Sequence, residues 1–378
     1  MIKVLLVANT DWYLYNHRLA LAQYLRRQGF EVALVSPPGS FTPQLAQAGF
    51  RWIDWPVGRA SALPWQESMA VLHLARIYRA ERPHLVHHFT IKPILYGSFA
   101  AHLAGVPSMV NSVTGRGYIF LSGETKARLL RPAVQLLYRF TLRSTRSQVI
   151  FENQFDRQYF IENHLAVAAR THLIPGVGVD AQKFTPSPPE DGLPVILYAG
   201  RLLWDKGIGV LIEAGRLLRQ RGLAFRLVLV GEPDAGNPSS IDAGVVRDWV
   251  AHGDAEWWGF QDEMARVYQQ AHIVVLPSFG EGVPTMLIEA AAMGRPLVAS
   301  DISGCRAVIR QDENGFLVPV RDPAALADAL ARLLVDPALR QRMGAVSRQL
   351  VLENFTHEII NRQTAEVYRT FFPDLELA

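Results

Sequence analysis

The 378-residue chain has almost no cysteine and no long apolar run. A single cysteine, Cys305, excludes an internal disulfide framework and suits a reducing compartment. No segment reaches the roughly 20 apolar residues of a membrane-spanning helix. The N-terminal apolar run is too short, and too weakly basic at its start, for a signal peptide. We therefore expect a cytoplasmic protein, soluble or held peripherally at the inner face of the cell membrane.

Metal-binding signatures are missing as well. The chain contains no Asp-x-Asp motif, and its histidines and lone cysteine lack the spacing of a zinc site. We expect neither a bound metal nor a cofactor. Short repeats and low-complexity tracts are also absent, while 49% hydrophobic and 19% charged residues are typical of a globular protein. This length exceeds what one core usually organises, which favours two domains.

Charge is divided unevenly along the chain. Residues 1–180 hold 19 Lys/Arg against 10 Asp/Glu, whereas residues 181–378 hold 19 against 25, so the first half should meet an anionic partner. Residues 125–147 alternate apolar side chains with Lys126, Arg128, Arg131, Arg139, Arg143 and Arg146. A basic amphipathic helix of this kind can bind an anionic membrane surface. A core helix with a solvated basic face is an equally simple interpretation, and nucleic acid is not an expected partner.

Short apolar runs alternate with helical patterns throughout, which predicts parallel sheets covered on both faces. The expected strands are 3–8, 31–35, 85–88, 108–113 and 148–152, followed by 195–199, 226–230, 272–276 and 296–300. The four prolines of residues 181–194 mark a linker. We therefore expect an α/β fold with two doubly wound domains, 1–180 and 195–355, that bind ligands at the carboxyl ends of their strands.

Two glutamates eight positions apart stand out in the second domain. Glu289 lies in an apolar segment, where an ionised carboxylate is costly without polar partners. Pro284 fits the first turn of a helix, so Glu281 should precede that helix and Glu289 should lie two turns in, roughly 12 Å away at about 1.5 Å per residue. Such a pair suits a long polyhydroxylated ligand.

A second group of candidates surrounds the helix starts of this domain. Arg201 and Lys206 follow a predicted strand, where two cations beside a helix N-terminus can bind a phosphate or diphosphate; solvated surface charge is the alternative. Donors to a ligand would come from Gly282, Val283 and Thr285, because Pro284 has no N–H. The aromatic segment 257–260 either borders a planar base or is core.

Residues from about 170 to 350 resemble the donor domain of retaining glycosyltransferases of family 4, which have the GT-B fold. The resemblance implies that Arg201 and Lys206 hold a nucleotide diphosphate, that Glu281 contacts the donor sugar and that Glu289 holds the ribose. It further implies two Rossmann-like domains facing across a cleft and a final helix, within 356–378, that crosses back to the first domain. The matching positions are Gly200, Arg201, Lys206, Gly207, Gly231, Gly259, 276–278, Glu281, Gly282, Glu289, Ala290, Gly294, Pro296 and 314–316.

The first half is similar to a narrower subgroup, through residues 89–97 and 110–118. That subgroup extends lipid-carrier-linked oligosaccharides of O-antigen, capsule or glycoprotein glycans, usually with an N-acetylhexosamine from a uridine diphosphate donor. The resemblance implies a polyprenyl-diphosphate saccharide as acceptor. The candidate acceptor residues are Thr90, Lys92, Asn111, Thr114 and Arg116, although Lys92 before Pro93 is equally explained as a solvated loop residue.

The chain also departs from the family pattern. The usual Gly-Gly pair of the first loop is replaced by residues 9–17, and the family's histidine after strand 108–113 is missing. His17, His87 and His88 are poor substitutes by position, and a histidine in an apolar strand is more often a satisfied core residue. In front-face displacement the leaving phosphate itself can take the acceptor proton, so no base is obligatory.

Three rival functions remain at this point. A transferase with a soluble acceptor, such as a sugar phosphate, would need the same donor site. A nucleotide-sugar epimerase shares the fold but needs no acceptor. A catalytically silent saccharide-binding subunit has no need of Arg201, Lys206 and both glutamates, which argues against it.

Overall fold

The computed structural model describes residues 1–58, 64–115, 120, 125–188 and 191–374, and it divides into two compact units. Unit 1 comprises residues 1–177 and 357–378, and unit 2 comprises residues 178–356. The predicted linker does not fall at this division. Phe184 is buried in the core of unit 2, and its carbonyl accepts a hydrogen bond from Arg348 (2.8 Å). The first part of segment 181–194 is therefore packed on the second unit.

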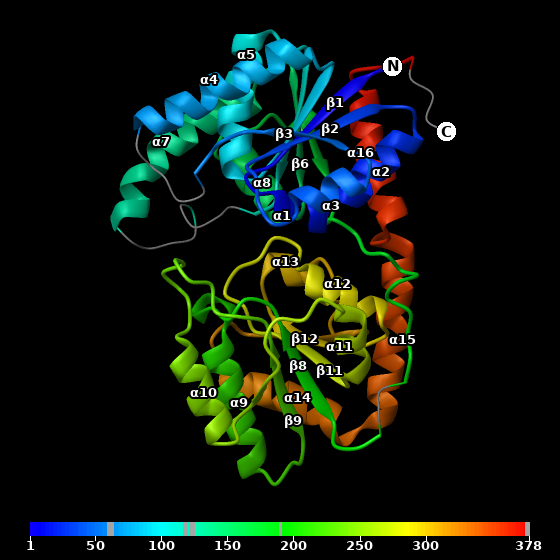
Figure 1. Ribbon diagram of the computed structural model, residues 1–378. Coiled ribbons are helices and arrows are strands. Elements are labelled where there is room, and N and C mark those ends of the chain that lie inside the picture. The colour runs from blue at the N-terminus through cyan, green and yellow to red at the C-terminus, as the bar shows by residue number, and fades with distance from the viewer. Residues whose placement is uncertain (59–63, 116–119, 121–124, 189–190, 375–378) are drawn as a thin grey trace. The chain divides into compact units, whose positions relative to one another are not determined.

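Unit 1 contains a seven-stranded parallel sheet in the order β3-β2-β1-β4-β5-β6-β7 (Figure 1). Its strands are β1 (Lys3–Val7), β2 (Glu31–Ser36), β3 (Arg51–Asp54), β4 (Leu85–Phe89), β5 (Ser108–Val113), β6 (Ser147–Phe151) and β7 (Thr171–Leu173). Alternate residues of β1 enter different cores, because Val4 and Leu6 pack in one apolar cluster and Leu5 and Val7 in another. Both faces of the sheet are thus covered, as the continuous apolar strands require.

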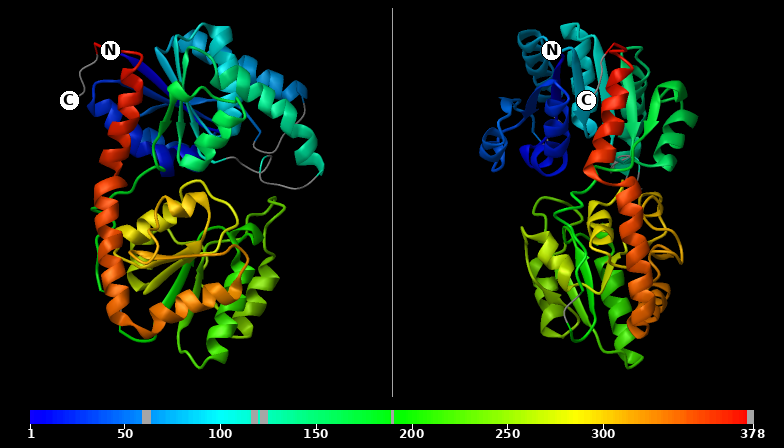
Figure 2. Two further views of the ribbon diagram at one scale, coloured as in Figure 1. Left: turned by 180° about the vertical axis from the view of Figure 1, so that it is seen from behind. Right: turned by 90° about the vertical axis from the view of Figure 1, so that its right-hand side faces the viewer.

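The helices of unit 1 form two layers on this sheet. They are α1 (Asp11–Tyr13), α2 (Leu19–Arg27), α3 (Thr42–Gln47), α4 (Pro64–Glu81), α5 (Ser98–Ala104), α7 (Thr125–Leu142), α8 (Gln154–Glu162) and α16 (His357–Arg369), with a 3-10 turn η3 (Ala168–Arg170) and two π-helical turns, η1 (Leu14–Arg18) and η2 (Pro93–Gly97). Helix α16, red in Figure 2, packs against α2, so the end of the chain completes the first unit. Helix α7 ends at Leu142, short of the predicted segment 125–147, because Ser147 already belongs to the buried strand β6.

Unit 2 repeats the same plan with six parallel strands in the order β10-β9-β8-β11-β12-β13. Its strands are β8 (Val195–Ala199), β9 (Arg226–Val230), β10 (Glu256–Trp257), β11 (Ile273–Leu276), β12 (Leu297–Ser300) and β13 (Gly315–Val318). Its helices are η4 (Trp204–Lys206), α9 (Ile208–Gln220), α10 (Ala243–Ala251), α11 (Met264–Gln270), α12 (Thr285–Ala292), α13 (Ser303–Arg306), α14 (Pro323–Val335) and α15 (Pro337–Asn354). Side chains of Asp242, Asp322 and Asp336 cap α10, α14 and α15 by accepting backbone N–H bonds, which starts each helix at a defined residue.

Candidate functional site

Each sheet reverses its strand order once, between β1 and β4 in unit 1 and between β8 and β11 in unit 2. Loops that leave the carboxyl ends of two such strands turn to opposite faces and leave a crevice where ligands bind in open α/β sheets. In unit 2 the loop after β8 carries Arg201 and Lys206, and the loop after β11 carries Glu281. The topology therefore brings the predicted donor residues to the switch point of their own domain.

Lys206 and Glu281 are in direct contact. Lys206 Nζ donates to Glu281 Oε1 at 2.5 Å, and both side chains are mostly shielded from solvent. The two loops are joined by their backbones as well, since Phe279 N donates to Asp205 O (2.9 Å). Gly207 makes this approach possible: its φ is +73°, and a Cβ there would collide with the Pro277 carbonyl oxygen. Close packing of the two loops fixes the cation opposite the carboxylate.

Arg201 is paired with an acid that the sequence argument missed. Its NH1 donates to Asp234 Oδ2 at 2.6 Å, while about half of the Arg201 side chain stays exposed. Asp234 follows β9, the neighbour of β8. Gly231 lets these strand exits lie together, because a Cβ there would collide with the Gly200 carbonyl oxygen. The sequence signal was a short acidic stretch directly after the strand 226–230.

Glu289 has the polar partner that its apolar setting demanded. It lies in α12, and Tyr268 donates its hydroxyl proton to Glu289 Oε2 (3.0 Å). Burial raises the pKa of Glu289 to about 7, against the opposing effects of the Tyr268 hydrogen bond and the charge of Lys183. Pro284 is the N-cap residue of α12, one position before the first turn where the sequence suggested it. Glu289 therefore changes its protonation near neutral pH.

The remaining donor-side candidates lie around the same strand exits. Thr285 is the first residue of α12, Val283 is buried in the core, and Gly282 is so close to Gly304 that a Cβ on Gly304 would overlap the Gly282 carbonyl. Gly259 follows β10, and its carbonyl accepts from Gly231 N (2.8 Å). Donor binding by these residues stays a prediction.

The aromatic segment after β10 is divided between core and surface. Trp257 and Trp258 pack partly buried against the unit 2 core, and Trp257 Nε1 donates to Gly231 O (2.7 Å). Phe260 is 62% exposed, and its backbone N–H donates to Glu232 Oε1 (3.2 Å). Phe260 is thus the aromatic residue of this segment that is open to a planar base.

The acceptor-side candidates of unit 1 separate into two groups. Thr90 follows β4, and Thr114 follows β5, where its side chain hydrogen-bonds the Tyr13 hydroxyl. Lys92 instead pairs with Glu67 (3.1 Å) and donates to Gly58 O (2.8 Å). Asn111 is fully buried. Arg116 lies outside the described residues.

Asn111 hydrogen-bonds one of the two strand histidines, His88, while His87 has its own partners. His88 bonds Asn111 Oδ1 (2.8 Å) and the Tyr78 hydroxyl (2.9 Å). His87 bonds the Tyr368 hydroxyl (2.6 Å) and Ser112 Oγ (2.7 Å). Both nitrogens of each imidazole are hydrogen-bonded, so His87 and His88 are satisfied core residues, as expected from the sequence.

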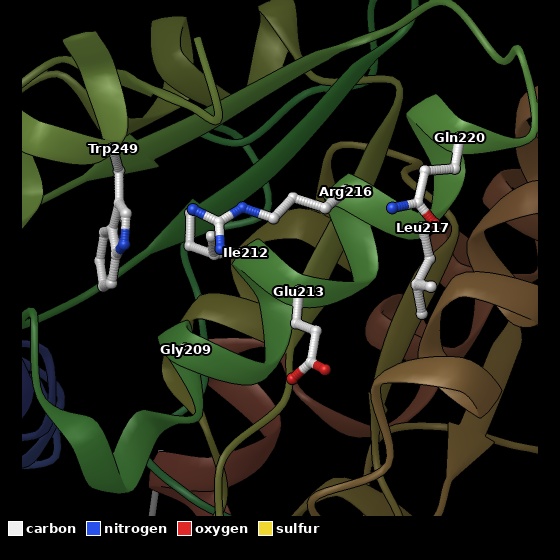
Figure 3. Close-up of a pocket in the computed structure, with 7 residues that line it drawn as sticks. All are labelled: Gly209, Ile212, Glu213, Arg216, Leu217, Gln220 and Trp249. Carbon is white, nitrogen blue, oxygen red and sulfur yellow. The ribbon is translucent and has the colours of Figure 1, made fainter. Parts of the chain in front are cut away.

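A surface cavity of about 430 Å³ lies between α9 and α10 and contains none of the predicted site residues (Figure 3). It is lined by Gly209, Ile212, Glu213, Arg216, Leu217, Gln220 and Trp249. Within the described ranges no cluster of three or more His, Cys, Asp or Glu side chains is arranged to hold a metal ion, and no helix is long and apolar enough to cross a membrane. Metal-independent chemistry stays a prediction.

Two family models match the chain at its two units. "Glycosyl transferase 4-like" matches residues 3–153, and "Glycosyl transferases group 1" matches residues 193–336, which contain the Arg201, Lys206 and Glu281 cluster. The chain is a family 4 glycosyltransferase. The pairing of two parallel-sheet units is accordingly the GT-B fold, and the enzyme transfers hexosyl units.

Several curated relatives resemble this glycosyltransferase over much of its length. It is 26% identical to N,N'-diacetylbacillosaminyl-diphospho-undecaprenol alpha-1,3-N-acetylgalactosaminyltransferase of Campylobacter jejuni, over 94% of this chain and 95% of the relative. It is 25% identical to UDP-Gal:alpha-D-GlcNAc-diphosphoundecaprenol alpha-1,3-galactosyltransferase of Escherichia coli, over 72% of both chains. A D-inositol 3-phosphate glycosyltransferase of Xylanimonas cellulosilytica is 35% identical over 47% of this chain and 46% of the relative.

Solved structures agree on the fold. Sucrose-phosphate synthase from Thermosynechococcus elongatus superposes with a TM-score of 0.80 at 22% identity, over 99% of this chain and 100% of that chain. At this identity the likeness supports the GT-B architecture alone.

Proposed function

We propose that this glycosyltransferase moves a hexosyl or N-acetylhexosaminyl unit, with retention, from a UDP-sugar to a polyprenyl-diphosphate-linked saccharide in cell-surface glycan assembly. The donor part of this proposal rests on the cluster of Arg201, Lys206 and Glu281 at the β8/β11 switch point. The acceptor half is supported by the basic first half of the chain and by the Campylobacter and Escherichia relatives, whose names specify diphospho-undecaprenol acceptors.

The chemistry follows from where charge develops. The bond between the sugar C1 and the β-phosphate oxygen breaks, and a new bond forms on the same face of C1 with the acceptor hydroxyl oxygen. As the first bond breaks, an extra negative charge that needs stabilisation develops on the β-phosphate, and it is neutralised when the hydroxyl proton passes to this leaving group. Arg201 and Lys206 would supply that stabilisation in a preorganised site, with Glu281 oriented toward the donor sugar by its bond to Lys206.

The test of the donor site is a transfer assay with a radiolabelled UDP-sugar and a synthetic polyprenyl-diphosphate saccharide. Replacing Arg201 by Ala or Glu281 by Gln should lower turnover by roughly 100-fold or more with little change in Tm, because Arg201 is half exposed and a glutamine side chain can still accept the hydrogen bond from Lys206. Arg221→Ala removes a comparably exposed arginine with one carboxylate partner, Asp328, and should keep full activity. Full activity of both site variants would contradict the assignment.

Membrane attachment is the second part of the proposal. Helix α7 exposes Leu129, Leu136 and Phe140 at helical spacing, with 75%, 66% and 51% of their surface open. Helix α4 exposes a second stripe, Trp65, Met69 and Leu72. Both helices pack on η2, and exposed apolar side chains beside Arg139 and Arg143 suit an anionic bilayer surface.

Vesicle flotation measures this attachment. The wild type should float with vesicles that contain anionic lipid and stay behind with purely zwitterionic vesicles. Leu129→Glu combined with Leu136→Glu should reduce flotation about tenfold or more, since two apolar contacts are lost and two acids are added. Leu352→Glu changes an exposed leucine of α15 in unit 2 and is the matched control. Equal flotation of all three proteins would count against the membrane role.

A soluble acceptor is the second candidate. The inositol phosphate glycosyltransferase relative has the higher identity, although over half of the chain only. Its name specifies a small phosphorylated acceptor. Transfer to inositol phosphate or another sugar phosphate, without transfer to the lipid-linked saccharide, would favour this candidate. Deuterium uptake into the UDP-sugar without any acceptor would instead indicate an epimerase.

A further inference from the structure

The loops at the switch point of unit 1 have rare backbone conformations. A π-helical turn, η1, follows β1, and another, η2, follows the adjacent strand β4. π-Helical turns are rare and frequently lie at functional sites. Thr90, at the exit of β4, has φ +69°, and it is the one β-branched residue among the five described non-glycine residues with positive φ. Such a strained backbone conformation costs free energy and is typical of functional sites.

Several buried polar atoms without hydrogen-bond partners lie in the same two loops. Eight buried side-chain polar atoms of the described residues lack a partner, and three of them belong to these two loops: His17 Nδ1, Arg18 Nε and Thr90 Oγ1. A buried polar atom without a partner costs roughly 1–3 kcal/mol, so each calls for an explanation.

The two acids near these loops, Asp11 and Glu152, already have partners. The Asp11 carboxylate accepts from Trp12 N (2.8 Å), Phe41 N (2.8 Å) and Thr42 Oγ1 (3.2 Å). Glu152, after β6, forms a buried ion pair with Arg18 (3.7 Å). Neither carboxylate is poised to meet a substrate hydroxyl.

The His17 ring is held in a fixed orientation. Its neighbours Trp12 and Tyr13 contact it edge to face, with ring centroids 5.1 Å away in each case. Tyr13 also accepts a hydrogen bond from Arg18 (2.8 Å), and its ring contacts that of Phe89, the last residue of β4 and the one before Thr90, with centroids 6.1 Å apart. Burial, together with the Arg18 charge, lowers the pKa of His17 to about 4, so the imidazole is neutral at physiological pH and keeps an acceptor lone pair.

We propose that His17 and Thr90 form a hydroxyl-binding site for the acceptor saccharide in unit 1, with the unpartnered Nδ1 of the imidazole accepting a hydrogen bond from a sugar hydroxyl. This inference rests on the proposed transferase function and assigns the acceptor-side residues that the sequence left open. His17 would be an oriented hydrogen-bond acceptor in the loop after β1, and Thr90 Oγ1 would offer a second donor or acceptor at the exit of the adjacent strand β4.

The test compares His17→Leu with His87→Leu, the same substitution at a histidine whose two nitrogens are both bonded. His17→Leu should leave Tm unchanged or higher, because it removes an unpartnered buried nitrogen, whereas His87→Leu should lower Tm. For transfer, His17→Leu should reduce kcat/KM for the acceptor by about tenfold or more. The rate of UDP-sugar hydrolysis in water and the KM for the donor should not change.

The outcomes separate this inference from the proposed function. A wild type that transfers only to a soluble sugar phosphate overturns the lipid-linked acceptor, and His17→Leu is then measured with that sugar phosphate. If the wild type transfers to either acceptor and His17→Leu does so with unchanged acceptor KM and kcat, the His17 site is wrong. A fall in Tm equal to that of His87→Leu would assign His17 to the core instead. Thr90→Ala should share the acceptor defect and raise acceptor KM.

Discussion

Glu289 is a residue whose expected role in ligand binding conflicts with the stability of the fold. The carboxylate has a pKa of about 7 in the folded protein, against an ordinary value of 4.5. Between these values the folded state keeps a proton that the unfolded state releases, so stability falls as pH rises from 4.5 to 7. The full shift corresponds to about 3 kcal/mol of unfolding free energy. The ionised form of Glu289 therefore lowers the stability of the folded protein, which fits a ligand-binding role.

Glu289→Gln is therefore predicted to act in opposite directions on stability and on donor affinity. At pH 8 the variant should have a higher Tm than the wild type, and at pH 4.5 the two should coincide. Binding of a UDP-sugar by the wild type should strengthen from pH 6 to pH 8, as the carboxylate forms, and the variant should lose this pH dependence. Isothermal titration calorimetry with an intact UDP-sugar avoids the titrating phosphate of free UDP. A wild-type affinity that is flat across this range would argue against ribose binding by Glu289.

At the same scale, the sequence suggested candidate residues for a donor site but not all of the partners that these residues have in the structure. Arg201, Lys206, Glu281 and Glu289 were chosen from their positions after strands or within an apolar helix. Asp234 and Tyr268 were missed, because each pairing joins segments about 20 to 35 positions apart whose proximity depends on strand order. Spacing along the chain carries no such information.

At the scale of elements, the four strands that the sequence argument missed are β3, β7, β10 and β13, and all lie at sheet edges. Edge strands need only part of an apolar pattern. β3 and β10 are half-buried at best, and β7 and β10 have three and two residues. The nine strands that were predicted are the interior ones, where burial on both faces gives continuous apolar runs.

The element that matters most for the site is the tight junction of η4 with β11. Gly207→Ala is predicted to destabilise the protein by about 2 kcal/mol more than Gly222→Ala and to abolish transfer, since the new methyl would push Lys206 away from Glu281. Gly222 is the matched control, because its φ is +77° yet no atom lies within 4 Å of its Cβ position. Urea unfolding and the transfer assay measure both effects. Equal losses in the two variants would mean that backbone strain alone is responsible.

At the scale of the whole molecule, the first unit depends on the last helix of the chain. α16 contributes Ile360, Ala365, Val367 and Tyr368 to a core cluster of unit 1, and the Tyr368 hydroxyl bonds His87. Truncation after Thr356 should therefore expose unit 1 to limited proteolysis and leave UDP binding by unit 2 intact. Tyr368→Phe is the milder version and should cost about 1–3 kcal/mol, because it leaves His87 Nδ1 without its partner. Proteolysis of unit 2 in the truncated protein would contradict this dependence.

The division of the chain has a consequence for how these enzymes diversify. Unit 2 is an uninterrupted insert whose two ends meet: Val179 N donates to Phe355 O at 2.8 Å, and Val179 forms a bridge with Thr356. Because its two ends are adjacent, the insert separates its two attachment points in unit 1 by only a short distance, whatever its length or sequence. A donor domain can thus be exchanged as one contiguous cassette through two neighbouring junctions. Two crossovers between relatives, one at each junction, would then combine one sugar donor with another acceptor.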